Sequence, residues 1–466
     1  MSSSALWQLS ATELAGLVAT RKVSPVEVTA SVLDRIAEVG GPLNAFVVLD
    51  AEGARDQAKA AEAAVMRGDT LGPIHGVPVT IKDMQAVKGL PTRRGHKLSD
   101  PAPAAEDCVA AGRLRAAGGI ILGKSTTTEM GWTAVSHNPL TGATHNPWKH
   151  GVTSGGSSSG AASLAGAGCG PLHLGSDGAG SVRLPSHFCG TIGHKPTFGT
   201  VPYNPTPNNG HLSHIGPITR SVADNELMLE VMAGLDPRDA TSHAIGFKRG
   251  TRRDVKGLRI AYSPDLGHAK VDREVADLVE AAARVFEDLG ANVEKVTPPW
   301  GPKGPALIRE LWGPALISYV PKDARAAESM DPGFVACLED AAKLEWKDVS
   351  AAYGRRLAYA AEFGTWFESG YDLLLTPSAS VAAFPVGRQR PEHWPQHDWD
   401  WLVWAEFSYP YNLAHGPAVS VPCGLTAAGL PVGLQIGGPR YADPLVMNAA
   451  GAFLAAKPFR YPWEMA

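Results

Sequence analysis

The chain has 466 residues, 44% of them hydrophobic and 19% charged, with a formal net charge of −4. This length and composition are those of a globular protein with a sizeable core, and the weak negative charge excludes the basic footprint of a nucleic-acid-binding protein. Five scattered cysteines without CxxC spacing are typical of a reducing compartment. The first residues lack a signal-peptide pattern, and no apolar stretch approaches the roughly 20 residues of a membrane helix. We therefore expect a cytoplasmic protein with no nucleic-acid or membrane partner.

Capping motifs mark the helices at the start of the chain. The patterns SATE at 10–13 and SPVE at 24–27 each place a glutamate three residues after a serine, and they predict helices over about 11–21 and 25–38. An alanine-rich segment predicts a third helix over about 51–67. We expect these N-terminal helices to occupy residues 1–68.

Strand and helix patterns alternate along the rest of the chain. A β-branched run over 76–81 predicts a buried strand that ends in Lys82 and Asp83. The further expected elements are a helix over 105–117, a strand over 119–122, a helix over 220–234, a basic connector at 248–256, a strand over 258–262, a helix over 272–289, a strand over 292–296, helices within 303–370, and strands over 372–377, 418–422 and 432–436. This alternation predicts one α/β domain over residues 1–466.

The segment 151–202 is so rich in glycine and serine that a flexible linker is the alternative to a folded segment. Two features favour folding. Apolar residues are spread through the segment, and Asp177 and Arg183 flank Ser181. Glycine interleaved with apolar residues indicates backbone held close to a ligand, with amide N–H groups directed at it.

Two familiar motifs occur in contexts that do not fit them. The segment 118–125 matches the Walker A phosphate loop, but its interior is apolar and a helix precedes it, so we expect a strand running into a turn. The segment 156–160 matches the nucleophile elbow of α/β-hydrolases, but no hydrophobic strand precedes it. A Ser–His–Asp esterase stays open as an alternative, because the chain has 15 histidines.

Histidine pairs and tryptophans are further candidate site markers. His211 and His214, and likewise His393 and His397, have the spacing of paired metal ligands, but no carboxylate or cysteine completes a recognisable metal pattern. We therefore expect no metal and no cofactor. The segment 385–404 is rich in aromatic residues, which indicates either a loop that lines a site or a packed surface flap.

Several motifs in order make the chain resemble the amidase signature hydrolases. They are PVTIKD ending at Asp83, GGSSSG over 155–160, LGSDGAGSVRLPSHFCG ending at Gly190, GHKPTFGTVP ending at Pro202, and, outside that core, GPITRSVADNELML and GLPVGLQIGGPR. Lys82 and Ser157 are 75 residues apart, and Ser157 and Ser181 are 24 apart, as in the family. The resemblance implies a large mixed, mostly parallel central sheet with helices on both faces. It also implies a signature core over about 76–202, with the remainder completing the sheet and the substrate pocket.

The resemblance implies a Ser–Ser–Lys triad in which Ser181 is the nucleophile, Ser157 is a bridging serine in a cis peptide, and Lys82 is the base. A serine hydroxyl is a weak nucleophile until a neighbouring base accepts its proton. A lysine serves as that base only when neutral, so burial must lower its pKa from about 10.4 toward neutrality. Lys82 ends a buried strand, where such desolvation is expected. Ser157 can relay the proton and later deliver it to the leaving amine.

The loop before the nucleophile is expected to form an oxyanion hole. The backbone N–H groups that would hold the developing negative charge belong to Gly178, Ala179, Gly180 and Ser181. Asp177 and Arg183 are expected to form a structural pair that holds the loop, with Ser158 in a supporting place; recognition of a phosphate or carboxylate by Arg183 is the alternative. Two positions depart from the family pattern: Ala179 stands in its usual glycine pair, and Thr126 replaces its asparagine.

These features predict an amidase that hydrolyses the C–N bond of a linear amide through an acyl-enzyme on Ser181. The expected partner is a small aryl or apolar amide, with carbamates (urethanes) and esters as variants that pass through a similar oxyanion. Six tryptophans suggest an apolar or aromatic pocket: Trp132, Trp148, Trp394, Trp399, Trp401 and Trp404. Three other classes stay open: a glutaminase-type component of a transfer-RNA amidotransferase, a Ser–His–Asp esterase and a non-catalytic binding protein. Assembly as a homodimer also stays open.

Overall fold

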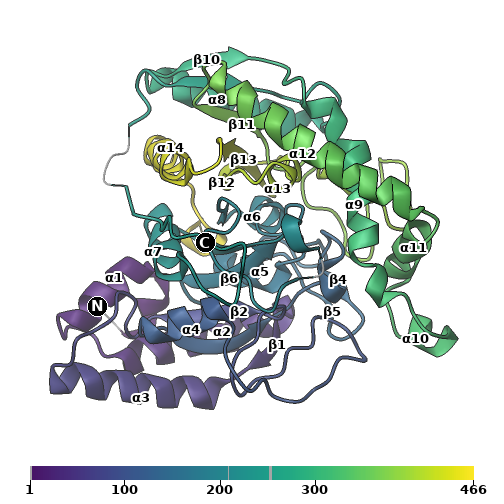
Figure 1. The fold of residues 1–466 in the computed structure, drawn as a ribbon. Helices are drawn as coiled ribbons and strands as arrows, with labels where there is room; N and C mark the ends of the chain where they lie inside the picture. The colour runs from purple at the N-terminus through teal and green to yellow at the C-terminus, as the bar shows by residue number, and fades with distance from the viewer. Residues whose placement is uncertain (1–2, 208, 251–253, 466) are drawn as a thin grey trace.

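The computed structural model describes residues 3–207, 209–250 and 254–465, and its ribbon is shown in Figure 1. In this described part of the chain, one 11-stranded sheet runs in the order β1-β3-β2-β6-β8-β7-β12-β13-β11-β9-β10. Its strands are β1 (Phe46–Leu49), β2 (Pro78–Lys82), β3 (Ile120–Ser125), β6 (Leu172–Asp177), β7 (Ile192–Lys195), β8 (His214–Thr219), β9 (Arg259–Tyr262), β10 (Asn292–Lys295), β11 (Leu373–Pro377), β12 (Ala418–Leu425) and β13 (Pro431–Gly437). A separate pair comprises β4 (His137–Asn138) and β5 (Gly142–Ala143).

The large mixed sheet is as expected, but its strands are not mostly parallel. Parallel pairing is confined to β3–β2–β6 and to β11–β9–β10, and the other neighbouring pairs are antiparallel. The strands β6 and β7 do run in the same direction, since each is antiparallel to β8, and α6 lies in the crossover connection that such a pair needs. However, β8 lies between them and runs opposite to both, and β12 and β13 form an antiparallel pair. Alternation along the sequence does not reveal such an insertion.

The helices begin largely where the capping motifs place them. Both expected capping boxes are present, at Ser10 with Glu13 and at Ser24 with Glu27. The α-helices are α1 (Ala11–Ala19), α2 (Pro25–Leu43), α3 (Ala51–Arg67), α4 (Val109–Ala116), α5 (Ser159–Gly166), α6 (Arg183–Cys189), α7 (Val222–Met232), α8 (Arg273–Asp288), α9 (Gly304–Ala315), α10 (Ala324–Glu328), α11 (Pro332–Ala341), α12 (Trp346–Glu368), α13 (Pro410–Leu413), α14 (Asp443–Ala456) and α15 (Pro462–Met465). Short 3₁₀ helices are η1 (Ser3–Gln8), η2 (Glu129–Gly131), η3 (Gly210–Leu212), η4 (Gly301–Lys303), η5 (Ile317–Tyr319) and η6 (Leu402–Trp404).

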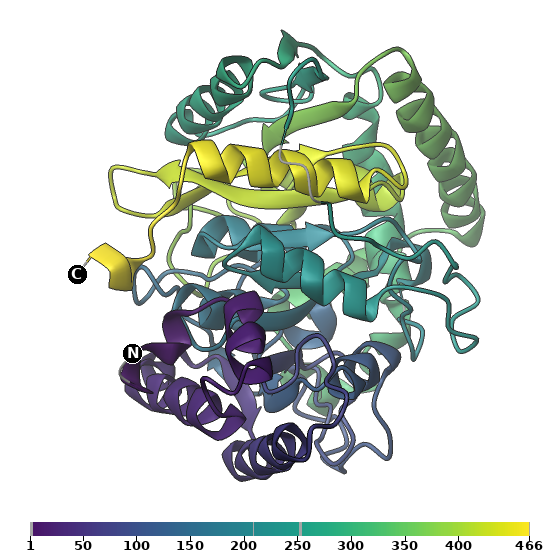
Figure 2. The same cartoon turned by 90° about the vertical axis from the view of Figure 1, so that its left-hand side faces the viewer.

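Helices cover both faces of the sheet because alternate strand residues point to opposite sides. In β11, Leu373 and Leu375 join one apolar cluster with residues of α7, α8 and α14, whereas Leu374 joins a second cluster with residues of α6, α9 and α12. Figure 2 shows α14 in yellow and α7 in teal running across the first face. Within the described residues, no helix is both long and apolar enough to cross a membrane.

The glycine-rich segment 151–202 lies inside the molecule rather than on its surface. Every residue from 152 to 203 is buried, and the segment supplies α5, β6, α6 and β7. The linker alternative is therefore wrong, because a buried backbone needs partners for its polar groups and finds them here in helices and strands. The basic connector expected at 248–256 includes residues 251–253, which lie outside the described residues.

Candidate active site

The expected site lies where two parallel strands end. The strands β2 and β6 are neighbours, with Ile81 opposite Leu174, so that Lys82 and Asp177 end them on the same edge of the sheet. The chain leaves β6 through a short loop that carries Ser181 and then enters α6. Ser157 precedes α5, which packs against β2, β6 and α6. Residues far apart in the sequence are thus brought to one place.

Lys82 is a buried amine without an acidic partner. Its side chain has no solvent exposure, and its Nζ donates hydrogen bonds to Ser157 Oγ at 2.7 Å, Ser176 Oγ at 3.0 Å and the Ser176 carbonyl at 3.2 Å. No ion pair to Lys82 occurs in the described part of the chain. Burial lowers the pKa of Lys82 from 10.5 to about 7, against the opposing effect of the Asp177 carboxylate. A substantial fraction of this amine is therefore neutral near pH 7.

The two candidate serines line one cavity of about 140 Å³. The peptide bond between Gly156 and Ser157 is cis, as expected. Ser181 Oγ makes no hydrogen bond to any described residue, and it borders the same space as Ser157. The structure therefore joins Lys82 to Ser157 directly, and it places Ser181 and Ser157 on the wall of a common cavity.

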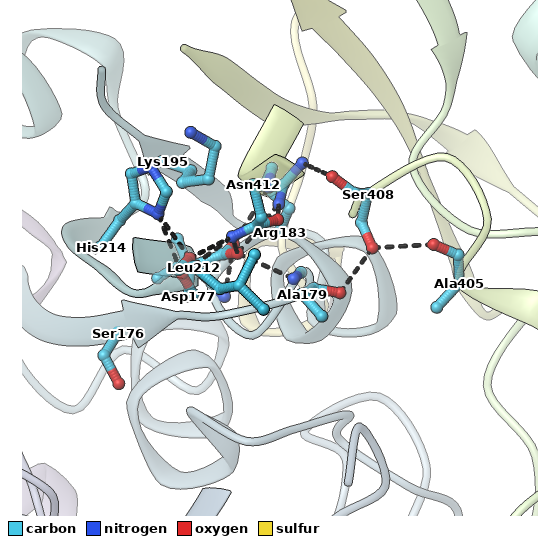
Figure 3. Close-up of polar contacts among 12 residues, drawn as sticks. Ser176, Asp177, Ala179, Arg183, Lys195, Leu212, His214, Ala405, Ser408 and Asn412 are labelled. Carbon is cyan, nitrogen blue, oxygen red and sulfur yellow. Dashed lines mark hydrogen bonds and ion pairs between the residues drawn. The ribbon is translucent and has the colours of Figure 1, made fainter. Parts of the chain in front are cut away.

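Asp177 and Arg183 form a saturated buried pair beneath the nucleophile loop (Figure 3). Both are fully buried, and the guanidinium binds the carboxylate through Nε at 3.0 Å and Nη2 at 2.9 Å. Its remaining N–H groups donate to the Ser408 carbonyl, Gln435 Oε1 and Asn412 Oδ1. Burial works against ionisation of Asp177, but Arg183 outweighs it and holds the pKa of this carboxyl well below its usual range. Because all five N–H donors of Arg183 are engaged by protein groups, Arg183 has the expected structural role and no donor left to bind a ligand.

The nucleophile loop leaves some of its N–H groups available and engages others. The N–H of Gly180 donates to Asp177 Oδ1 at 2.7 Å. Those of Gly178, Ala179 and Ser181 have no partner among the described residues. Gly180 has φ +117°, and a Cβ there would clash with Ser408 Oγ, so only glycine fits. Ala179 does not have a positive φ, and its methyl joins a buried apolar cluster, so the departure from the family pattern is accommodated.

The supporting residues have structural contacts. Ser158 Oγ donates to the Ser176 carbonyl and accepts from the Ser176 N–H, so it fixes the end of β6. Thr126 is buried, and its hydroxyl lies 2.6 Å from Thr144 Oγ1. The Walker-like segment forms the buried strand β3 and not a phosphate loop. Its Lys124 pairs with Asp83 at 3.1 Å.

The cavity wall differs from the expected aromatic pocket. None of the six tryptophans singled out in the sequence lines the cavity. They pack instead in or against one buried apolar cluster, because large aromatic surfaces gain most from full burial. Trp312 lines the cavity in their place, together with Met84, Met130 and Leu316. No histidine is among the lining residues of the described chain, which leaves the Ser–His–Asp esterase without a base.

Neither histidine pair belongs to a metal-binding cluster of the described residues. His393 Nε2 contacts Asp272, whereas His397 Nδ1 accepts from the Trp399 and Asp400 N–H groups. His214 contacts the Leu212 carbonyl. No group of three His, Cys, Asp or Glu side chains in the described ranges is arranged to hold a metal ion.

Several site residues were not apparent from the sequence. Arg94 lines the cavity but lies outside every motif quoted from the sequence. Ser176 contacts Lys82 and lies within the quoted LGSDGAGSVRLPSHFCG motif, so a sequence signal marked its position but not its contact. Gln435 lies within the quoted GLPVGLQIGGPR motif, so its contact with Arg183 had a signal. Ser408 and Asn412 had none.

Comparisons with known proteins agree with one another. A model of the Amidase family matches residues 27–447. An acylamidase of Rhodococcus erythropolis is 41% identical over 474 residues, covering 98% of each chain. The A component of the glutamyl-tRNA(Gln) amidotransferase of Moorella thermoacetica is 34% identical over 485 residues, covering 96% of each chain. The structure of a bacterial aryl acylamidase of the amidase signature family has a TM-score of 0.90 at 29% identity, covering 97% of this chain and 96% of the other.

Proposed function

Because this chain belongs to the amidase signature family, we propose that it works with Ser181 as nucleophile, Ser157 as proton relay and Lys82 as base. The chain is an amidase that acts on linear amides. The strongest support for the residue assignment is the 2.7 Å contact between Lys82 Nζ and Ser157 Oγ. It is made by a buried amine whose pKa is near 7, which is the condition for a lysine to act as a base.

The reaction proceeds by acyl transfer to water. Neutral Lys82 accepts the proton of Ser157 while Ser157 accepts that of Ser181, and Ser181 Oγ attacks the amide carbonyl carbon. The C–N bond then breaks, and the leaving amine takes its proton from Ser157. Water, deprotonated by the same relay, hydrolyses the acyl-enzyme and restores Ser181. The relay requires a hydrogen bond from Ser181 Oγ to Ser157 Oγ in the substrate complex, where catalytic hydrogen bonds commonly become shorter than in the free enzyme.

We assign the oxyanion hole to the unpartnered N–H groups of the loop. The candidates are those of Gly178, Ala179 and Ser181, while the Gly180 N–H stays with Asp177. Asp177 is in turn held by Arg183. The loop donors are thereby fixed before substrate arrives, which is the basis of electrostatic stabilisation of a tetrahedral intermediate.

The substrates that this site fits are aryl or apolar amides, and aryl carbamates as a variant with a similar oxyanion. Apolar side chains such as Trp312 and Leu316 line the cavity beside the two serines. The acylamidase relative is 41% identical to the chain, whereas the amidotransferase relative is 34% identical. This order of similarity supports an amidase that acts on its own rather than the glutaminase part of a larger complex.

The test compares Ser181→Ala with the parent enzyme on acetanilide and phenyl carbamate. We expect hydrolysis of both to fall by about 10⁴-fold or more, as on removal of a nucleophile in other serine hydrolases, and fluorophosphonate labelling to disappear. The exposed Ser369 provides a matched control, and Ser369→Ala should keep both properties. Retention of turnover or labelling in Ser181→Ala would contradict the assignment of the nucleophile.

A further inference from the structure

We propose that Arg94 binds a carboxylate of the substrate, so that the preferred amides of this enzyme are acidic. This inference rests on the proposed function, since it concerns the cavity that holds Ser157 and Ser181. Arg94 lines that cavity with them, and it is the one charged side chain among the described lining residues.

The guanidinium of Arg94 is a cation without a partner among the described residues. It is partly buried, yet it makes no ion pair, side-chain hydrogen bond or ring contact with any residue in the described ranges. Of the other arginines, Arg93 donates to the Lys97 carbonyl, and Arg183 is saturated by protein partners. A partly desolvated cation without a partner is costly unless a ligand supplies the opposite charge.

The acidic side chains next to the Arg94 loop are already committed. Asp83 Oδ1 accepts from Lys124 Nζ at 3.1 Å and from the Arg93 N–H at 3.2 Å. Glu129 Oε1 lies 2.6 Å from His96 Nδ1, and its Oε2 accepts from the Asp331 N–H at 2.7 Å. Neither carboxylate therefore neutralises the Arg94 guanidinium, which stays available to a ligand in the cavity.

The backbone holds Arg94 in a fixed and unusual conformation. Arg94 and Met130 have φ of +53° and +49°, and the Met130 N–H donates to the Arg94 carbonyl at 2.8 Å. Lys124 Nζ also donates to the Pro91 carbonyl and to Thr92 Oγ1, so the buried Lys124 anchors the loop. Left-handed backbone in non-glycine residues persists only where its surroundings enforce it, and such residues cluster at ligand sites.

The rest of the cavity fixes the chemical class of the substrate. Met84, Met130, Leu316 and Trp312 offer apolar surface, which suits an aryl or alkyl group. Arginine matches a carboxylate with two parallel hydrogen bonds. The ligand chemistry is thus an amide whose apolar group carries a carboxylate, either on the amine side of the scissile bond or on the acyl side.

A binding experiment in the Ser181→Ala background tests this without turnover. Isothermal titration calorimetry compares 4-acetamidobenzoate with 4-acetamidobenzamide, which place the charge on the amine side. It also compares succinanilic acid with its primary amide, which place the charge on the acyl side. We expect the acid to bind about tenfold or more tightly than its neutral partner in at least one pair, because hydrogen bonds to charged groups are the strong ones.

Variants of the two neighbouring arginines then assign the preference. Arg94→Met and Arg94→Gln should each reduce the ratio of acid to amide affinity to about one, and Arg94→Lys should restore part of it. Arg93→Met is the matched control and should keep the full ratio. An absence of preference in both pairs, or a preference that survives Arg94→Met and Arg94→Gln, would overturn the inference. Hydrolysis of neutral acetanilide by the parent enzyme, which retains Ser181, tests the proposed function separately. The proposed function and the role of Arg94 can therefore fail independently.

Discussion

Two buried lysines on neighbouring strands differ in the groups that their amines contact. Lys82 on β2 and Lys124 on β3 lie almost side by side, with Ile81 opposite Lys124 in the parallel pair, and both are fully buried. Lys82 contacts only hydroxyl and carbonyl oxygens. Lys124 contacts the carboxylate of Asp83 and two oxygens of the 91–92 loop. Burial is the same, and the partner differs.

The presence or absence of a contacting carboxylate distinguishes the catalytic role proposed for Lys82 from the structural role of Lys124. Burial lowers the pKa of both amines. At Lys124 the charge and hydrogen bond of Asp83 oppose this effect and favour the ammonium form. At Lys82 the opposing carboxylate of Asp177 makes no contact and is itself neutralised by Arg183. An amine with a direct acidic partner is a structural element, and one without it is a candidate base.

The largest expected effect is the loss of activity in Lys82→Met. Removing a general base typically costs 10²–10⁴-fold, so we expect kcat/KM on acetanilide to fall by about 10³-fold. The free energy of unfolding should not fall, because methionine fills the space without the desolvation cost of an amine. Steady-state kinetics and urea denaturation measure the two quantities. Retention of more than a tenth of the activity would show that Lys82 is not the base.

Lys124→Met should act on stability instead. It leaves the Asp83 carboxylate buried without its partner, and breaking a buried pair in this way costs about 3–5 kcal/mol. Urea denaturation followed by circular dichroism measures the loss. Asp83→Asn combined with Lys124→Met should recover part of it, because no unpaired charge remains. If the double variant is no more stable than Lys124→Met, the ion pair is not what holds this loop.

The pH dependence of the reaction sharpens the difference further. Protonated Lys82 cannot accept a proton, and its pKa is about 7. We therefore expect kcat/KM to rise about tenfold per pH unit below pH 7 and to level off above it. The rate of fluorophosphonate labelling should follow the same curve. A pH-independent rate between pH 5 and pH 8 would contradict a base at this position.

The smallest effects come from removing one hydroxyl beside each lysine. Ser176→Ala removes an acceptor that favours the protonated form of Lys82, so the acidic limb of the rate profile should move to lower pH. Thr92→Val removes the corresponding acceptor of Lys124. It should lower the free energy of unfolding by about 1 kcal/mol and leave the acidic limb in place. An equal shift of the acidic limb in Ser176→Ala and Thr92→Val would contradict the different roles of the two lysines.

Local patterns in the sequence were sufficient for many elements of this fold. The capping boxes at Ser10 and Ser24 begin helices as expected, and the β-branched run before Lys82 forms a buried strand. The family resemblance carried by the ordered motifs also implied the contact that Lys82 makes with Ser157. These features depend on neighbouring residues or on ordered motifs, which a single sequence displays.

Long-range contacts were not predictable in the same way. The antiparallel position of β8 between β6 and β7 depends on strand order, which alternation does not encode. The tryptophans near residue 400 form core rather than cavity wall, because aromatic composition is the same in both settings. Arg94 reaches the cavity through a loop whose conformation is set by Lys124, Asp83 and Met130. No local pattern marks such a combination.

The reach of Arg183 has a consequence for the order in which the enzyme becomes competent during its synthesis. Its partners Ser408, Asn412 and Gln435 lie 225, 229 and 252 residues further along the chain. A ribosome that has made the whole glycine-rich segment has therefore made the nucleophile but not the groups that hold its loop. We therefore expect the nascent chain to be inactive until β13, which carries Gln435, has left the ribosomal exit tunnel.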